Sequence, residues 1–138
     1  MRSGEATGGA SITGYGSNSL ATPTLFFVTG SENASVLSIM IQGTVLTAGS
    51  VFGHGVRCMT TFKRLFQKNA SGGSVTMPAF PIDANIPTRS AALGNTILAG
   101  QKRWYQVYYR DNTLLLPGCP APAARFTATN GAEITWLP

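Results

Sequence analysis

Charge is scarce in this chain of 138 residues: only 11% of them are Asp, Glu, Lys or Arg, against about 25% in an average soluble domain. The five acids are far apart in the sequence, whereas a glycosidase needs two facing carboxylates. None of the common nucleotide-binding, metalloprotease or nucleophile-elbow motifs occurs. We therefore expect no enzyme activity, no metal and no cofactor. The acids are Glu5, Glu32, Asp83, Asp111 and Glu133.

Long apolar runs are missing too. Runs such as Leu25–Val28 have strand length and are far below the roughly 20 residues that a helix needs to cross a bilayer. We expect no membrane span. No apolar segment of a signal peptide follows Met1, so a secreted form would be a processed chain or part of a longer product.

Cysteine is nearly absent, with only Cys58 and Cys119 in the chain. Each lies beside turn-forming residues, and a long β-patterned stretch separates them, which favours one structural disulfide over two buried free thiols. A catalytic thiol is disfavoured because His54 is the only histidine and a Cys/His pair would lack an orienting partner. Closing a loop of about 60 residues would stabilise the fold by roughly 4 kcal/mol and would indicate an oxidising compartment.

Basic residues outnumber acidic ones by ten to five, which gives a net charge of +5. This excess favours an acidic polymer or an anionic cell surface as partner. The basic residues are scattered along the chain and accompany no nucleic-acid module, so we expect no nucleic acid as ligand. His54 lies between two glycines, where a surface turn is favoured over a metal site because no second histidine or carboxylate cluster accompanies it.

Sixteen glycines and eight prolines divide the chain into short strands. The pattern predicts one domain over residues 19–138, an all-β antiparallel sandwich of about eight strands, jelly-roll-like, without a convincing helix. We expect Thr24–Thr29 and Val36–Gln42 to pair as a hairpin. A second hairpin is expected across Asn130-Gly131, and one helical turn is expected to begin at Ser90. The expected strands are Thr24–Thr29, Val36–Gln42, Thr44–Ser50, Val56–Phe66, Ser74–Met77, Arg103–Asp111, Ala124–Ala128 and Ala132–Trp136.

Residues 1–18 are rich in Gly and Ser and contain few large apolar groups. Such a segment is expected to be a flexible tail or an assembly strand. Ordering it requires a partner, most economically the edge strand of another copy of the chain. Ile12 and Tyr15 are then the expected anchors in the neighbour's groove.

The most aromatic strand is Arg103–Asp111. Its alternation places Trp104, Gln106 and Tyr108 on one face and the residues between them on the other. Packing into a core is the simpler interpretation of such aromatic residues. The alternative is a surface for stacking sugars, built from the Trp104 and Tyr108 rings and the Gln106 amide.

The order of these motifs is similar to that of a known module. Phe52–Cys58, Gly100–Asp111, Cys119-Pro120 and Phe126–Trp136 together resemble the C-terminal β module of many secreted multidomain proteins of environmental Gram-negative bacteria. The resemblance runs from near Ser19 to Trp136. It implies secretion, a β-sandwich and a Cys58–Cys119 bond, and it brings no established activity. The chain differs from the module at His54, which is usually Asp, and at Tyr108, often Trp.

Taken together, the sequence predicts an extracellular structural or assembly module at the cell surface, whose partners are copies of itself. The alternative is a carbohydrate-binding module that binds cell-surface polysaccharide through Trp104 and Tyr108.

Overall fold

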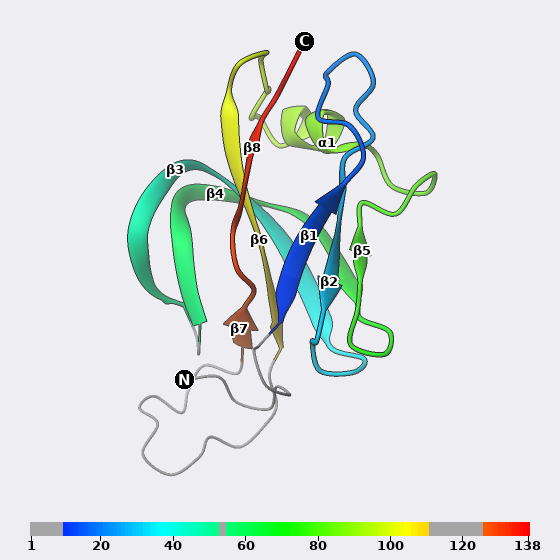
Figure 1. Ribbon diagram of the computed structural model, residues 1–138, viewed down its shortest axis with the longest axis vertical. Coiled ribbons are helices and arrows are strands. Elements are labelled where there is room, and N and C mark those ends of the chain that lie inside the picture. Colours follow the sequence, from blue (N-terminus) through cyan, green and yellow to red (C-terminus); the bar gives the residue numbers. More distant parts are fainter. Residues whose placement is uncertain (1–9, 53–54, 111–125) are drawn as a thin grey trace.

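Two antiparallel β-sheets packed face to face form the body of the molecule (Figure 1). The computed structural model describes residues 10–52, 55–110 and 126–138. The described part has eight strands and one helix. They are β1 (Ser11–Tyr15), β2 (Phe26–Gly30), β3 (Leu37–Phe52), β4 (Gly55–Asn69), β5 (Thr76–Met77), α1 (Ile86–Ala92), β6 (Lys102–Arg110), β7 (Phe126–Ala128) and β8 (Ala132–Thr135).

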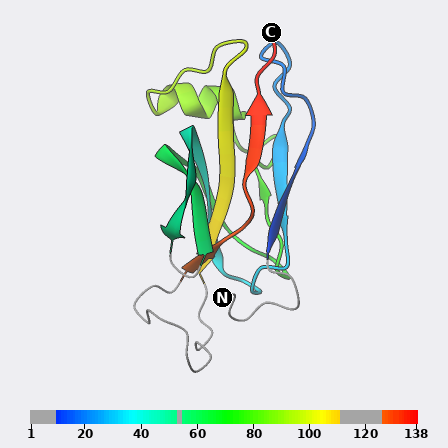
Figure 2. The same ribbon diagram turned by 60° about the vertical axis from the view of Figure 1, so that its left-hand side comes forward.

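The smaller sheet has the order β1-β2-β5, and the larger has the order β4-β3-β6-β7. Strand β8 also pairs with β6, beside β7 along the same edge. Figure 2 shows the two layers from the side. The predicted antiparallel β-sandwich is thus confirmed.

The core between the layers contains large aromatic and aliphatic side chains and one chain of buried polar groups. Trp136 Nε1 donates a hydrogen bond to the Tyr105 hydroxyl at 3.0 Å, and that hydroxyl donates to Gln42 Oε1 at 2.9 Å. Gln42 Nε2 in turn donates to Ser90 Oγ on α1 at 2.8 Å. Burial raises the pKa of Tyr105, against a smaller lowering by the bond from Trp136. These bonds connect the larger sheet to the helix through the core.

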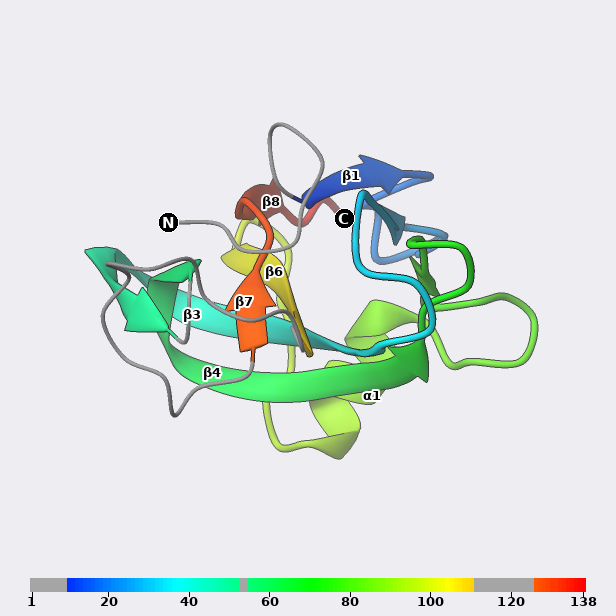
Figure 3. The ribbon, with the colours of Figure 1, turned by 90° about the horizontal axis from the view of Figure 1, so that it is seen from below.

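The first predicted hairpin is wrong. Strand β2 pairs with β1 and β5 in the smaller sheet, whereas β3 lies in the larger sheet. The turn between them contains Ser31 and Ser35, both with positive φ, and Glu32 is buried there. The segment crosses from one layer to the other, as Figure 3 shows from below, and β3 makes its hairpin with β4 instead.

The hairpin expected across Asn130-Gly131 is also wrong. Strands β7 and β8 both pair with β6 and follow one another along it. The side chain of Asn130 is used elsewhere: its Oδ1 accepts a hydrogen bond from the backbone N–H of Ile12 at 2.9 Å. The Asn-Gly pair therefore connects two short strands on one edge rather than reversing the chain.

The helix begins earlier than the predicted turn at Ser90. Asn85 is its N-cap, and its side chain accepts a hydrogen bond from Thr88 N at 2.9 Å. Pro87 lies in the first turn, where its missing N–H leaves no intrahelical bond unmade. Ile86 is fully buried, so α1 contributes its first residue to the core.

The described part of the N-terminal segment belongs to the sandwich. From Ser11 to Tyr15 it forms β1, which pairs with β2 of the same chain. Ile12 is 5% exposed and lies in the core, while the exposed Tyr15 ring stacks on Phe26 with centroids 5.6 Å apart. The sequence predicts Ile12 as an anchor in a neighbour; in the structure its side chain lies in the core of its own chain, and its backbone N–H donates to Asn130 Oδ1. Residues 1–9 lie outside the described residues.

Candidate functional site

The longest strands, β3 and β4, extend beyond the sandwich and arch away from it (Figure 1). We call their distal part, residues 43–52 and 55–60, the arm. The register of the pair shifts between Met40 and Ile41 and again between Leu46 and Ser50. Such bulges bend a hairpin and increase its twist. The arm is therefore a curved extension of the larger sheet.

The arm is fastened to the outer face of the larger sheet, the face that points away from the smaller sheet. Gln106 Nε2 donates hydrogen bonds to the carbonyl oxygens of Val56 and Thr129, each at 2.7 Å. The Met59 side chain lies over Gly43, where an added Cβ would come within 2.6 Å of Met59 Cβ. Met59 is fully buried although it lies outside the main core cluster. Met59 thus packs within the arm, and the Gln106–Val56 hydrogen bond joins the arm to β6.

The outer face carries the aromatic residues that the sequence singles out. Tyr105, Val107 and Tyr109 point into the main core, so Trp104 and Tyr108 lie on the outer face, both partly exposed. Gln106, which lies between them on the strand, is 1% exposed. Because its amide bonds two backbone carbonyls, it offers no N–H group to a surface ligand.

Trp104 is held at the β8 side of this face. Its Nε1 donates to Glu133 Oε2 at 3.0 Å, and Lys102 Nζ lies 2.7 Å from Glu133 Oε1. The hydrogen bond from Lys102, followed by that from Trp104, lowers the pKa of Glu133. The indole ring is thus positioned by an exposed ion pair.

Tyr108 lies at the other end of the face, where its ring meets Phe126 edge-on with centroids 5.8 Å apart. The guanidinium carbon of Arg64 is 6.0 Å from the centre of the Tyr108 ring. Four residues along a strand place Trp104 and Tyr108 about 13 Å apart. The two rings therefore form separate surfaces with buried Gln106 between them.

Exposed apolar side chains gather on the arm. Val45, Leu46 and Val56 are 49%, 54% and 52% exposed. Among the described strands β4 pairs only with β3, so its other edge has no strand partner within residues 10–52, 55–110 and 126–138. The arm thus combines an edge that no described strand pairs with and apolar side chains in solvent.

The predicted disulfide is not seen. Cys58 is a free thiol, partly buried within the arm. It lies between Arg57 and Met59, opposite the register shift in β3. Cys119 lies outside the described residues, as do His54 and Asp111. The inference that the protein lies in an oxidising compartment therefore no longer has a disulfide bond to support it.

No group of three or more His, Cys, Asp or Glu in the described part of the chain is placed to hold a metal ion. Glu32, one buried acid, accepts a hydrogen bond from Ser38 Oγ, and burial raises its pKa. It lies in the turn between β2 and β3, away from the arm. Within the described ranges, α1 is too short to cross a membrane.

No family model, curated protein or solved structure matches this chain.

Proposed function

We propose that this chain is a non-enzymatic structural module of a cell surface or secreted assembly, and that copies of it associate through the arm. The observation that carries the proposal is the exposed apolar cluster of Val45, Leu46 and Val56 on the arm, beside an edge of β4 that no described strand pairs with and on which Gln106 engages the Val56 carbonyl. An exposed strand edge is a template for pairing with another chain. The resemblance of the sequence to modules of secreted proteins supports a location outside the cell or at its surface.

The two halves of β4 differ in how their edge is protected. The half that belongs to the body contains Lys63, Arg64 and Lys68, and Arg89 from α1 donates a hydrogen bond to the Leu65 carbonyl there. Charged side chains and covering elements are the usual means of preventing edge-to-edge association. The half in the arm, residues 55–60, has Arg57 as its only charged residue. Association is therefore expected at the arm rather than along the body.

The part of the N-terminal segment that the structure describes pairs within its own chain. Because Ser11–Tyr15 pairs with β2 of its own chain, the proposal does not require it to bind a neighbour. Its contribution is to cover one edge of the smaller sheet.

A triple variant tests the proposal. Val45→Thr, Leu46→Thr and Val56→Thr together remove the apolar surface of the arm while keeping residues compatible with strands. We expect light scattering after gel filtration to show assemblies for the unmodified chain and monomers for this variant. The matched control carries Ile82→Thr, Leu98→Thr and Leu137→Thr, which alter exposed apolar residues outside the arm. Unchanged assembly of the arm variant would contradict the proposal.

Carbohydrate binding is the second candidate, favoured by the partial exposure of Trp104 and Tyr108 on the outer face. Aromatic rings of this kind present an apolar face and a polar edge to a ligand. Trp136 is fully buried, so a change in tryptophan fluorescence on adding polysaccharide would report on Trp104. A folded Trp104→Ala variant should then lose the response. A response that this variant retains would exclude Trp104 as the binding residue.

A further inference from the structure

A depression of about 340 Å³ lies at the body half of β4, where it meets α1. Two arginines from different elements line it, Arg64 on β4 and Arg89 on α1. The remaining lining is apolar or amide. It is formed by Ile39, Leu65, Phe66 and Gln67.

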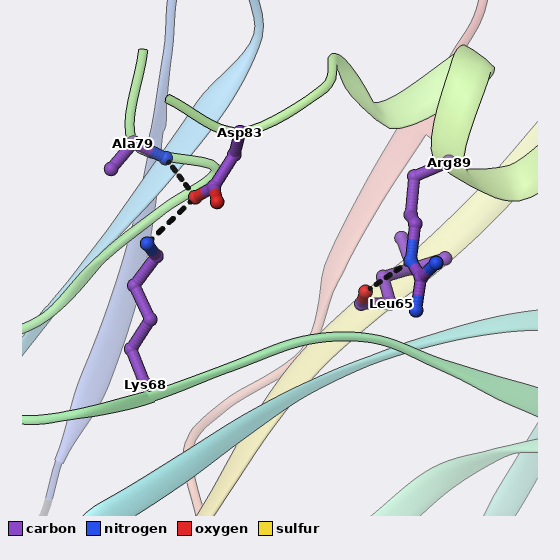
Figure 4. A network of polar contacts seen from close by, with 5 residues as sticks. All are labelled: Leu65, Lys68, Ala79, Asp83 and Arg89. Carbon is purple, nitrogen blue, oxygen red and sulfur yellow. Dashed lines mark hydrogen bonds and ion pairs between the residues drawn. The ribbon is translucent and has the colours of Figure 1, made fainter. Parts of the chain in front are cut away.

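Arg89 is held in place by the strand edge beside it. Its Nε donates a hydrogen bond to the Leu65 carbonyl oxygen at 2.8 Å (Figure 4). The side chain is partly buried, and its two terminal nitrogens have no hydrogen-bond partner within residues 10–52, 55–110 and 126–138. A guanidinium fixed through one nitrogen presents its other N–H groups in a preorganised arrangement.

Within the described part of the chain, neither arginine forms an ion pair with an acidic side chain. The described ion pairs are Lys68–Asp83 and Lys102–Glu133, and neither includes Arg64 or Arg89. Asp83, drawn in the same close-up (Figure 4), already has partners: its Oδ2 accepts from Lys68 Nζ at 2.8 Å and from Ala79 N at 2.7 Å. Burial acts to raise the pKa of Asp83, but these bonds outweigh it and the pKa is lowered. The positive charge of the depression is therefore available to a ligand.

We propose that this depression binds the carboxylate of an acidic sugar, such as a uronic acid residue within a polysaccharide. Guanidinium groups bind carboxylates through paired, charge-assisted hydrogen bonds. Partly exposed Ile39 supplies an apolar surface for the face of a sugar ring, and the Gln67 amide supplies a donor and an acceptor for hydroxyl groups. The net charge of +5 favours the approach of an acidic polymer.

The strand edge favours a sugar over an acidic peptide. A peptide that adds to β4 as a new strand needs the carbonyl groups of the edge as acceptors. Arg89 occupies the Leu65 carbonyl, and the register of β4 shifts at the same residue. A ligand that relies on its carboxylate and ring rather than on backbone pairing fits this place better. The depression lies outside the arm, so binding there does not depend on self-association. It extends the second candidate function, carbohydrate binding, by naming acidic sugars as the ligand and a site separate from Trp104 and Tyr108.

The test is a titration of the ¹⁵N-labelled full chain with a trimer of galacturonic acid, followed by NMR. We expect amide shifts at Ile39 and Gln67. Arg64→Gln removes one guanidinium group. Arg89→Lys keeps the positive charge but removes the paired N–H donors of the guanidinium. Each of these two variants should bind the trimer about tenfold more weakly, because hydrogen bonds between charged groups are stronger than those between neutral groups. Lys63→Gln is the matched control. It lowers the net charge as Arg64→Gln does, but Lys63 lies outside the depression. The affinity of this variant for the trimer should stay within twofold of that of the unmodified chain.

The fully methyl-esterified trimer, which has no carboxylate, should not bind. Equal binding of the ester, equal losses in Lys63→Gln and Arg64→Gln, or no binding of the acid would each overturn the proposal. Tighter binding of inorganic sulfate or of a hexaglutamate peptide would overturn the ligand class. Shifts confined to Trp104 and its neighbours would support the second candidate function and contradict this site.

Discussion

The side-chain amide of Gln106 donates a hydrogen bond at 2.7 Å to the carbonyl oxygen of Val56, fifty residues earlier in the chain. The same nitrogen bonds the Thr129 carbonyl oxygen, also at 2.7 Å. One buried amide thus connects the arm, β6 and the turn before β8. This bond sets the position of the arm on which the proposed association depends.

Gln106→Leu should release the arm. It removes two hydrogen bonds and leaves the Val56 and Thr129 carbonyls without this donor, which should lower the free energy of unfolding by about 1–3 kcal/mol. Urea unfolding measures the change. Gln67→Ala, at an exposed position on β4, serves as control and should change stability by less than about 0.5 kcal/mol. Equal stabilities of the two variants would show that the bond is unimportant.

Gly43→Ala should displace Met59. The new Cβ would lie 2.6–2.7 Å from three atoms of the Met59 side chain, and overpacking of this kind costs roughly 1–3 kcal/mol. Gly30→Ala, another glycine in a strand, is the control, because its Cβ would come no nearer than 3.7 Å to Ser11 Oγ. Thermal unfolding should separate the two variants. If Gly43→Ala is as stable as Gly30→Ala, Met59 does not pack there.

Ile12→Ala should destabilise the whole domain, because Ile12 is 5% exposed in the core. A large-to-small change at such a site costs about 2–5 kcal/mol. The neighbouring Thr13→Ala, at an exposed position, should be almost neutral. Denaturant unfolding of both variants tests whether the segment folds on its own chain; a neutral Ile12→Ala would restore the flexible-tail interpretation.

Glu32 should make stability depend on pH. Burial raises its pKa above the ordinary value of 4.5, while the hydrogen bond from Ser38 acts in the opposite direction. Protonated Glu32 is thus favoured in the folded state, so its stabilisation is complete below pH 4.5 and is lost as the pH rises through the folded pKa. Relative to Glu32→Gln, the unmodified chain should lose stability as the pH rises from low to neutral values. Parallel pH profiles of the two proteins would contradict this.

The alternation of polar and apolar residues was sufficient to predict the layered fold. The period of two places Tyr105, Val107 and Tyr109 on one face of β6, whereas only the structure shows that this face is the inward one. Pairing was harder to predict, because a short strand carries no information on which of several neighbours it will meet. The β2 and β3 segments are adjacent in sequence, yet the buried turn at Glu32 carries the chain to the other sheet.

The arm does not follow from the sequence pattern, because a glycine after Val36–Gln42 indicates the end of a strand. In the structure the strand continues through Gly43, whose missing side chain makes room for Met59. The continued β pattern from Thr44 to Ser50 was the available signal. The depression between Arg64 and Arg89 does not follow from the sequence, since these residues come together only through the packing of α1 against β4.

Sedimentation velocity of the full chain over a wide range of concentration tests self-association most directly. The account predicts species that grow with concentration to multiples of the monomer mass, and a single monomer species for the Val45→Thr, Leu46→Thr, Val56→Thr variant under the same conditions. A monomer at every concentration in both proteins would contradict it.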